Sequence, residues 1–403
     1  MNSLKSPMEE NIPNLTRRKF INITGLTAAA ALGLQQISCS GTKHSGKNVS
    51  TFEAPKIAGF ETAAESDVDH KGWQPVSDRK IRVGLVGYGA SRFSAAFGFQ
   101  DHPNVEVIAV SDLFPDRCAA LAKTARCSKT YPSLEELVKD DNIEAVFVAT
   151  DAPSHALHAI EVLNHGKHVA TAVPAIFGSL EEADKLHEAV TSSGKKYMMF
   201  ETSFFREDNY AMRQIYNADG FGKLVYSEGE YYHYAGDNWP ASYKEWRIGI
   251  PPQFYPTHSN AYYICVTGGS FIDVSCLGMK SVTKDFQVGA NKYNNQFATE
   301  IALFRTSEGG MSRMAVSWDT PGPENEIGRV RGQKGSFYEK YVGLEKTLPS
   351  LVRPPLPATI SPGGHGGSHG RLTDEFITAI LQDRQPLVDI GMALNLSAAG
   401  IVA

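Results

Sequence analysis

The sequence predicts an α/β protein in which a doubly wound parallel sheet is followed by an α+β domain with a largely antiparallel open sheet. Short apolar runs of strand length alternate with helical patterns between residues 80 and 200, which is typical of parallel sheets with crossover helices. The first apolar run ends in a glycine turn that leads into a helical pattern. From Tyr226 onward, strand patterns follow one another without long helices between them, which favours antiparallel pairing.

Composition narrows the class of protein without indicating its chemistry. The chain has 403 residues, of which 42% are hydrophobic and 21% charged, the balance of a folded globular protein. Its 39 basic and 44 acidic residues give a net charge of −5, which argues against a nucleic-acid partner held by a broad basic surface. The five cysteines show no CxxC spacing, so we expect neither a zinc site nor a disulfide scaffold. The classes of protein that these numbers leave open are an enzyme and a binding protein.

The first 79 residues are typical of segments outside the fold. The pair Arg17-Arg18 precedes a mostly apolar stretch, residues 21–34, which resembles a twin-arginine export signal and is too short to span a bilayer as a helix. Cys39 follows a small residue, as in lipoprotein processing sites, so a lipid anchor at Cys39 and simple cleavage are both open. We therefore expect an export signal over residues 1–40, a polar tether over 41–79 and a periplasmic protein.

The glycine turn predicts a dinucleotide site. Gly87 permits a tight turn after the strand 81–86, and Gly89 lets the backbone approach a pyrophosphate at the start of the helical pattern that follows. The third glycine of the usual motif is replaced by Arg92, which weakens the match. The predicted cofactor-binding residues of this loop are Gly87, Gly89, Ala90, Ser91 and Arg92.

Asp112 indicates which dinucleotide would bind. The second strand, residues 105–110, ends in Ser111-Asp112, roughly 20 residues beyond Gly89. A carboxylate at this strand tip accepts the ribose hydroxyls and repels a 2′-phosphate, so Asp112 favours NAD over NADP. The alternative is that Asp112 caps the segment after it, and the two roles can coexist.

The remaining elements of this half continue the alternation. Ser133 and Glu136 form a capping box at the helix that begins with Leu134. Further strands are expected over residues 145–150, 167–171 and 196–200, and further helices over 155–164 and 179–192. The pattern is that of a Rossmann domain over residues 80–200.

Several motifs together resemble one family. The strings GYGASR, VSD, ATDAPSHALHAIEVLNHGKHV and AVPA, in that order, resemble the Gfo/Idh/MocA oxidoreductases, and the resemblance covers residues 80–403. It implies an NAD-binding Rossmann domain and a substrate-binding α+β domain over residues 201–403, whose open sheet often pairs with a second copy. It also implies cofactor contacts at Thr150, His155, Val173 and Pro174, although a packing role for His155 is equally open.

The chain departs from the family at two positions. Where the family usually has Glu-Lys-Pro, with a lysine that relays a proton, this chain has Ala172-Val173-Pro174. Where the family commonly has an Asp four residues before its catalytic histidine, this chain has Phe254 before His258. Val173 cannot transfer a proton, so the ordinary dehydrogenase mechanism of the family is in doubt.

These departures resemble one branch of the family. The string YPTH, the missing lysine and the glycine-rich segment 363–367 are similar to the exported NAD-dependent glycosidases typified by α-N-acetylgalactosaminidases, although Ser259 replaces an expected glycine. By this resemblance His258 is the catalytic acid/base, and Tyr255 shares the proton or binds substrate. A capping or core histidine and a packed tyrosine are the alternatives.

Four further residues are expected to bind the substrate. The pair Trp246-Arg247 combines a flat apolar face with a fork of donors, which suits sugar rings and their hydroxyls. His233 lies in an alternating strand pattern, and His365 lies in a glycine-rich loop suited to covering a substrate. His365 and His369 have no carboxylate or cysteine nearby in the sequence, so we expect no metal site.

These observations predict an exported NAD-dependent oxidoreductase that acts on a sugar or glycoside. Free NAD is not expected outside the cytoplasm, so the cofactor would be tightly bound and recycled within each catalytic cycle. Two alternatives stay open. One is a redox-neutral glycosidase that oxidises carbon 3, eliminates the aglycone, adds water and returns the hydride. The other is a non-catalytic carbohydrate-binding or scaffold protein. We also expect a homo-oligomer formed through the open sheet.

Overall fold

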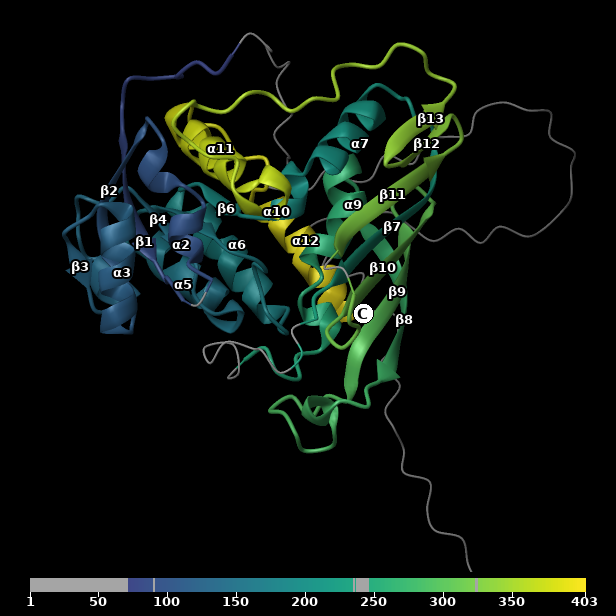
Figure 1. Ribbon diagram of the computed structural model, residues 1–403, viewed down its shortest axis with the longest axis horizontal. Coiled ribbons are helices and arrows are strands. Elements are labelled where there is room, and N and C mark those ends of the chain that lie inside the picture. Colours follow the sequence, from purple (N-terminus) through teal and green to yellow (C-terminus); the bar gives the residue numbers. More distant parts are fainter. Residues whose placement is uncertain (1–71, 90, 235, 237–245, 323–324) are drawn as a thin grey trace, which may run out of the picture. The chain divides into compact units, whose positions relative to one another are not determined.

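The computed structural model describes residues 72–403 except residues 90, 235, 237–245 and 323–324 (Figure 1). The predicted export signal, Cys39, most of the tether and the loop residue Ala90 therefore lie outside the described residues. Within the described ranges, no helix combines the length and the apolar character needed to cross a membrane.

The first sheet has six strands in the order β3-β2-β1-β4-β5-β6, and every pairing in it is parallel. The strand order turns back between β1 and β4, which creates the crevice where dinucleotides bind in doubly wound sheets. The strands are β1 (Ile81–Val86), β2 (Val105–Ser111), β3 (Thr130–Tyr131), β4 (Ala145–Val148), β5 (His168–Thr171) and β6 (Tyr197–Met199). The predicted parallel doubly wound sheet is confirmed.

Helices connect these strands, and one differs from the expected pattern. The crossover helices are α3 (Pro115–Ala125), α4 (Leu134–Leu137), α5 (His155–Asn164) and α6 (Glu181–Ser193). The helix expected after the glycine turn, α2 (Phe93–Ala96), is a single turn followed by the 3₁₀ segment Phe99–Asp101. Gly98, with φ of 77°, ends it, and Phe99 then turns into the core against the rings of Phe147 and Phe200. The predicted helical pattern is therefore only one turn of helix, because core packing of Phe99 interrupts it.

The second sheet has seven strands in the order β13-β12-β11-β7-β10-β9-β8. All its pairings are antiparallel except that of β7 with β10, which confirms a largely antiparallel sheet. The strands are β7 (Leu224–Tyr232), β8 (Phe271–Lys280), β9 (Phe297–Thr306), β10 (Met311–Ser317), β11 (Asn325–Gly332), β12 (Gly335–Tyr338) and β13 (Lys340–Gly343).

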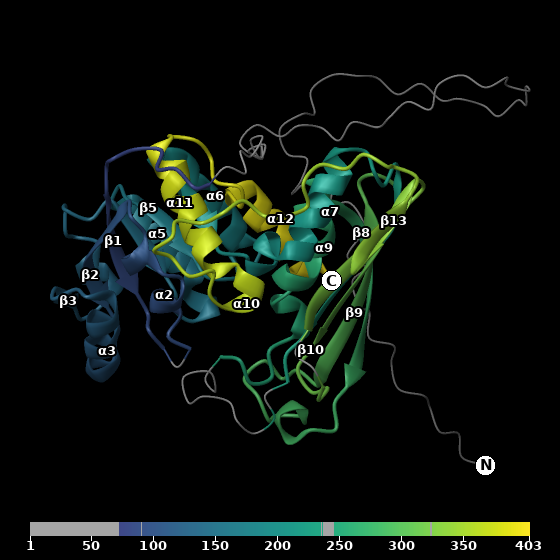
Figure 2. The ribbon, with the colours of Figure 1, turned by 45° about the horizontal axis from the view of Figure 1, so that its top comes forward.

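Helix α9 (Thr257–Thr267) packs closely on one face of this sheet, and Figure 2 shows α7 (Glu207–Asn217) and α9 on the same side. Two glycines permit the close approach: a Cβ on Gly229 would lie 1.9 Å from the Ser259 carbonyl oxygen, and one on Gly328 would lie 2.1 Å from Cγ of Tyr262. The sequence of β7 and β11 thus fixes where α9, and with it His258, meets the sheet.

The last helices, α11 (His369–Leu381) and α12 (Ile390–Val402), return to the first sheet. The Met199 amide donates to the Val388 carbonyl at 3.0 Å, and the Thr373 hydroxyl donates to the Phe97 carbonyl at 2.8 Å. The ring of Phe376 packs edge-on against Phe99. The core around the first sheet therefore includes residues from the end of the chain.

Candidate active site

The predicted cofactor residues lie along one edge of the first sheet. Gly87 follows β1, Asp112 follows β2, Thr150 lies beyond β4 and Val173 lies beyond β5. Because all these strands are parallel, their carboxyl ends share one edge, along which the residues follow the strand order as Asp112, Gly87, Thr150 and Val173. Continuing along the same edge, β6 ends just before Glu201.

The glycine loop has the backbone form that a phosphate cradle needs. Gly87 has φ of +85°, and a Cβ there would lie 2.4 Å from the Ala149 carbonyl oxygen, so no larger residue fits. Gly89 has φ of +57°, and a Cβ there would meet nothing within 4 Å, so the space above it is open to a ligand. Arg92, with φ of 56°, precedes α2 where the motif's third glycine would stand. These residues fit the approach of a pyrophosphate.

Asp112 is hydrogen-bonded to that loop. Its Oδ2 accepts the Tyr88 amide at 2.8 Å and the Gly89 amide at 3.4 Å, while its Oδ1 accepts the Phe114 amide at 2.9 Å. The carboxylate therefore caps the segment after β2 and also stands beside the glycine turn. These contacts show the capping role that the sequence left open, and ribose binding by Asp112 stays a prediction.

His155 connects the loops that follow β4 and β5 at the carboxyl edge of the first sheet. Its ring is buried, with Nδ1 2.9 Å from the Pro174 carbonyl oxygen and Nε2 3.1 Å from the Thr150 carbonyl oxygen. Burial lowers the pKa of His155, while the two carbonyl contacts oppose that shift. The position suits a residue that holds the Thr150 and Pro174 loops, and cofactor contact by His155 stays a prediction.

The two positions that depart from the family pattern are apolar in the structure as well. Val173 is buried, and the Val173–Pro174 bond is cis. The ring of Phe254 packs edge-on against Phe177, and its Cε2 lies 2.6 Å from where a Cβ on Gly178 would stand. Neither position can move a proton, so acid/base chemistry must come from elsewhere.

His258 pairs with a carboxylate that the sequence reading did not single out. His258 lies in the first turn of α9, and its Nδ1 is 2.6 Å from Oε1 of Glu201, which follows β6. The same Oε1 accepts the Ser203 amide at 2.9 Å. Within the described ranges, no other hydrogen bond engages the His258 ring, so Nε2 remains for a reacting group. A carboxylate on Nδ1 fixes the ring's orientation and tautomer.

A second carboxylate completes the group. Oε2 of Glu326, on β11, lies 3.9 Å from Nδ1 of His258 and accepts the Ser203 hydroxyl at 3.0 Å. Burial acts to lower the pKa of His258, but the charges of Glu201 and Glu326 outweigh it and raise that pKa above its usual value. Burial likewise acts to raise the pKa of Glu326, but His258, His365 and Arg206 reverse it. The two carboxylates thus favour the protonated form of the His258 ring, a group able to give or take a proton.

Aromatic rings lie around His258 on the side that faces the second sheet. The Tyr231 ring meets the His258 ring edge-on at 4.7 Å, and the Tyr255 ring lies 5.9 Å from it. Arg247 donates to the Tyr231 hydroxyl at 3.0 Å and lies over the Tyr255 ring at 4.7 Å. Trp246 is buried against Phe177 and Tyr255, so its faces pack inside the protein.

The remaining predicted residues lie on two sides of this group. His233 follows β7, beside Tyr231, and burial followed by the charge of Arg247 lowers its pKa to about 3. His365 and His369 contact each other, Nδ1 to Nε2 at 2.7 Å, and His365 Nε2 lies 3.9 Å from Oε1 of Glu326. The glycine-rich loop is therefore tied to the site through Glu326. Substrate binding by these residues stays a prediction.

Of the two carboxylates, only Glu201 could have been found from the sequence. Glu201 directly follows the predicted strand 196–200, so the edge argument that selected Asp112 applies to it equally. Glu326 lies near the start of β11. Its pairing with His258 depends on how α9 crosses β11, which the strand pattern does not specify. In the described part of the chain, no group of three His, Cys, Asp or Glu side chains is arranged to hold a metal.

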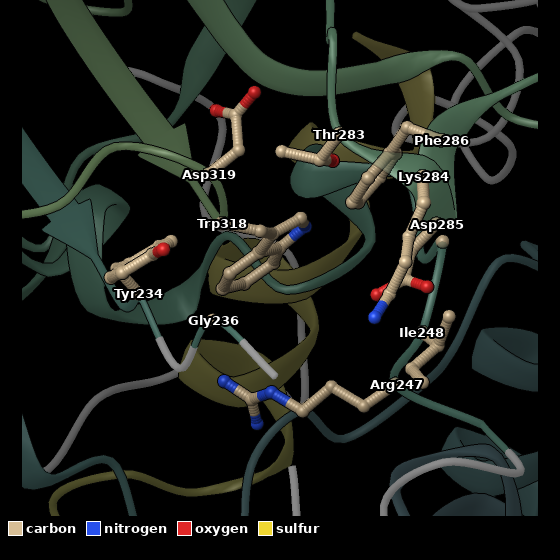
Figure 3. A pocket seen from close by; sticks show the side chains of 11 residues that line it. Tyr234, Gly236, Arg247, Ile248, Thr283, Lys284, Asp285, Phe286, Trp318 and Asp319 are labelled. Carbon is tan, nitrogen blue, oxygen red and sulfur yellow. The ribbon is translucent and has the colours of Figure 1, made fainter. Parts of the chain in front are cut away.

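A cavity of about 250 Å³ opens beyond the aromatic rings (Figure 3). Arg247 and Trp318 form the side nearest His258, since Trp318 contacts the rings of Tyr231 and Tyr255. The lining also includes Tyr234, Gly236, Ile248, Gly249, Thr283, Lys284, Asp285, Phe286 and Asp319. His258 and Glu201 do not line it, so the cavity is distinct from the acid/base pair.

Two curated relatives of the chain are named as glycosyl hydrolase family 109 proteins. A glycosyl hydrolase family 109 protein of Porphyromonas gingivalis is 27% identical over 53% of this chain and 47% of its own length. Glycosyl hydrolase family 109 protein 1 of Bacteroides thetaiotaomicron is 28% identical over 77% of this chain and 70% of its own length. The chain thus spans about half of the first relative and over two thirds of the second.

Solved structures and a family model agree on the fold. A scyllo-inositol dehydrogenase from Lactobacillus casei, with bound cofactor NAD(H) and scyllo-inositol, matches 80% of this chain and 95% of its own with a TM-score of 0.63 and 14% identity. Residues 81–201 match the model of the oxidoreductase family with an NAD-binding Rossmann fold, Gfo/Idh/MocA. The chain is therefore similar to the NAD-binding domain of the Gfo/Idh/MocA oxidoreductases over residues 81–201, and to glycosyl hydrolase family 109 protein 1 over 77% of its length.

Proposed function

We propose that this protein is an exported, redox-neutral NAD-dependent glycosidase that uses the His258–Glu201 pair as its acid/base. The observation that carries the proposal is the 2.6 Å contact between His258 Nδ1 and Glu201 Oε1, on the same sheet edge as the glycine loop. The relatives named glycosyl hydrolase family 109, and the YPTH and Val173 features of that branch, support cleavage over simple oxidation.

Different residues would bind the cofactor and transfer the proton. Gly87, Gly89 and Asp112 would hold NAD, which when bound would accept the hydride from the sugar and later return it. Nε2 of His258 would take the proton from the sugar hydroxyl being oxidised and return it at the end of the cycle. Glu201 holds the Nδ1 proton and stabilises the charged ring while the proton is on it.

The burial of His258 and Glu201 favours a catalytic cycle that is completed within the protein. His258 and Glu201 are only 4% and 0% exposed, so water reaches the proton-transfer pair poorly. Oε2 of Glu201 is buried without a hydrogen-bond partner in the described ranges, which leaves an acceptor for a substrate hydroxyl or a water molecule. Tyr255, close to His258 in the aromatic group, would orient the sugar ring or share its proton.

The test begins with the full protein exchanged into cofactor-free buffer. Denaturation should release close to one NAD per chain, and incubation with α- and β-glycosides in deuterated water should release sugar with deuterium at carbon 2. A His258→Gln variant should keep its NAD and lose roughly 10²–10⁴-fold in kcat. A His165→Gln variant at the end of α5, far along the chain from the pair, should retain activity.

The second candidate is a sugar oxidoreductase that recycles its cofactor between two substrates. The family model, which describes an oxidoreductase family, favours it. In the same assay it would give bound NAD and keto-sugar or sugar-alcohol products without cleavage. A protein that neither contains NAD nor binds added NAD would contradict both proposals and favour a carbohydrate-binding scaffold.

Export and anchoring form a separate part of the proposal. Arg17-Arg18 and the apolar stretch 21–34 support passage through the twin-arginine route, and Cys39 supports a lipid anchor as one outcome of processing. Replacing both arginines with lysine should leave the protein in the cytoplasm, as measured by cell fractionation. A Cys39→Ser variant should remain exported but leave the membrane fraction if Cys39 carries lipid.

A further inference from the structure

The contacts of His369 determine which of its ring nitrogens carries the proton. Its Nδ1 lies 3.2 Å from the Ala96 carbonyl oxygen, and because a carbonyl only accepts hydrogen bonds, Nδ1 carries the proton. Burial, followed by the charge of His365, lowers the pKa of His369 to about 4, so the ring is neutral at neutral pH. Nε2 of His369 is therefore an acceptor.

The same reasoning extends to His365. Its Nδ1 lies 2.7 Å from Nε2 of His369, and because that nitrogen accepts, Nδ1 of His365 must donate. Burial also lowers the pKa of His365, and a neutral ring with its proton on Nδ1 has none on Nε2. The His365 side chain is 32% exposed, and in the part of the chain that the structure describes no hydrogen bond engages its Nε2. This nitrogen is thus available as an acceptor.

Glu326 acts against this arrangement of protons. Its Oε1 lies 3.9 Å from Nε2 of His365, too far for a hydrogen bond but close enough to attract a proton to that nitrogen. Without the acceptor on His369, the proton of a neutral His365 ring would therefore move from Nδ1 to Nε2. Nε2 would then be a donor toward Glu326. His369 thus decides which tautomer His365 adopts.

The backbone of the glycine-rich segment keeps the two rings together. His365 has φ of 47°, in the left-handed region, and its neighbours in the segment are glycines. A Cβ on Gly363 would lie 2.8 Å from Cβ of His369, so His369 packs closely only against a glycine. Arg353 donates to the Gly366 carbonyl at 3.2 Å. The position of His365 relative to His369 is therefore fixed by the chain itself.

The Ala96 carbonyl belongs to the cofactor side of the site. Ala96 ends α2, which begins directly after the predicted pyrophosphate loop. The ring of His369 packs against that of Phe97, the next residue, with 4.2 Å between the ring centroids. A chain of hydrogen bonds therefore leads from α2 through His369 to His365, whose Nε2 lies on the side of Glu326.

We propose that His369 is a positioning residue, which holds His365 with its proton on Nδ1 so that Nε2 accepts a hydrogen bond from a substrate hydroxyl. The inference rests on the proposed function, in which a sugar is held beside His258 and Glu201. His369 does not touch the substrate in this proposal, because it is buried and both of its ring nitrogens are already engaged.

The first test reads the position of the proton in the NAD-loaded full protein labelled with ¹⁵N-histidine. Long-range ¹⁵N–¹H spectra distinguish a protonated ring nitrogen from an unprotonated one, and a His365→Gln variant identifies the His365 signals. The wild type should show the proton on Nδ1 of His365. His369→Phe keeps a ring beside Phe97 but has no acceptor, and should show the proton on Nε2. His369→Gln supplies an amide oxygen as acceptor and should restore the proton to Nδ1.

The second test asks whether this tautomer matters for the reaction. With 4-nitrophenyl α-N-acetylgalactosaminide as the probe, His369→Phe should lower kcat/KM about tenfold and His369→Gln less than about threefold, because only the former removes the acceptor. The matched control is His168→Phe. His168 begins β5 at the opposite edge of the sheet, its Nδ1 accepts the Lys196 amide, and burial lowers its pKa to about 4 as well. This control should change neither the His365 signals nor kcat/KM.

A wild-type His365 that carries its proton on Nε2, or one that keeps it on Nδ1 in His369→Phe, would overturn the proposal. A changed tautomer with unchanged kcat/KM in His369→Phe would overturn it as well. If the wild type hydrolyses no glycoside, the proposed function fails, and addition of N-acetylgalactosamine decides separately. A shift of the His365 Nε2 signal that is lost in His369→Phe supports the positioning role, and absence of that shift in the wild type overturns it.

Discussion

His258 illustrates how a single side chain acquires its chemistry from two distant strands. Glu201 follows the last strand of the parallel sheet, Glu326 lies on the antiparallel sheet, and both carboxylates lie within 4 Å of Nδ1. Burial and the two charges act in opposite directions on the pKa of His258, and the charges prevail. The proton affinity of the histidine therefore depends on the carboxylates remaining charged.

A Glu201→Gln variant should lower the pKa of His258, because burial would no longer be offset by the nearest charge. The inflection assigned to His258 in the pH profile of kcat/KM should move to lower pH. Glu326→Gln should move it in the same direction but less, because 3.9 Å rather than 2.6 Å separates Glu326 from Nδ1. Profiles that coincide for wild type and Glu201→Gln would contradict this assignment.

The same pair makes stability depend on pH. The folded pKa of His258 lies above that of an exposed histidine, about 6.5. Its contribution is therefore complete below about pH 6.5 and is lost as the pH rises through the folded value. The difference in thermal midpoint between wild type and Glu201→Gln should be largest under acidic conditions and shrink above neutrality. A difference that grows with pH would refute the sign of this shift.

At the scale of one element, the glycine loop can be tested without disturbing the fold. Gly89→Ala adds a Cβ that meets no protein atom, but the Cβ enters the space where a pyrophosphate would approach. We expect NAD affinity to fall at least tenfold, measured by calorimetry on cofactor-free protein. Gly194→Ala is the matched control: φ is +64°, the added Cβ is equally free, and it ends α6, away from the cofactor edge. Both should lose a similar ~1 kcal/mol to backbone strain, and equal NAD affinity in the two would contradict the cradle.

Helix α12 offers a second test at this scale. Asp389 caps it, with Oδ1 accepting the Met392 amide at 3.0 Å, and burial raises the pKa of Asp389 to about 6. The folded state thus binds this proton more tightly than the unfolded chain, so stability falls as the pH rises from about 4 to about 6. Asp389→Asn keeps the cap and should lack that fall, whereas Asp389→Ala should lose about 1 kcal/mol at every pH. Urea unfolding at several pH values separates the two, and equal losses at pH 7 would contradict the cap.

The sequence predicts some features of the fold and the site better than others. Gly87, Asp112 and Thr150 could be placed because parallel strands put their carboxyl ends on one edge, a rule that needs only strand order. The length of α2 could not, since it depends on Phe99 packing under Phe147 and Phe200. The pairing of His258 with Glu326 depends on the crossing of α9 over β11, which Gly328 permits and the alternation pattern does not encode.

At the scale of the whole molecule, the second sheet presents an apolar face away from α9. Gly229 meets α9, and its partners Met314 and Ala302 in neighbouring strands share that face. Side chains alternate along strands, so Leu303 and Ile301 point the other way, together with Leu277, which pairs with Ile301. Leu277 is 81% exposed and Leu303 is 46% exposed. Contiguous exposed apolar residues of this kind mark interaction surfaces.

We expect this face to pair with a second copy of the chain. A two-fold interface is self-complementary, and the face carries both charge signs, with Arg313 bonded to Glu228 and Glu230, between apolar strips that a partner could cover. Leu277→Lys should place a charge in that contact and shift the protein to monomer in sedimentation velocity. Leu157→Lys, a comparably exposed leucine at 68% on α5, should leave the mass of the assembly unchanged. Leu277→Lys should keep its NAD, because the cofactor edge belongs to the other sheet. A monomeric wild-type protein would refute the interface.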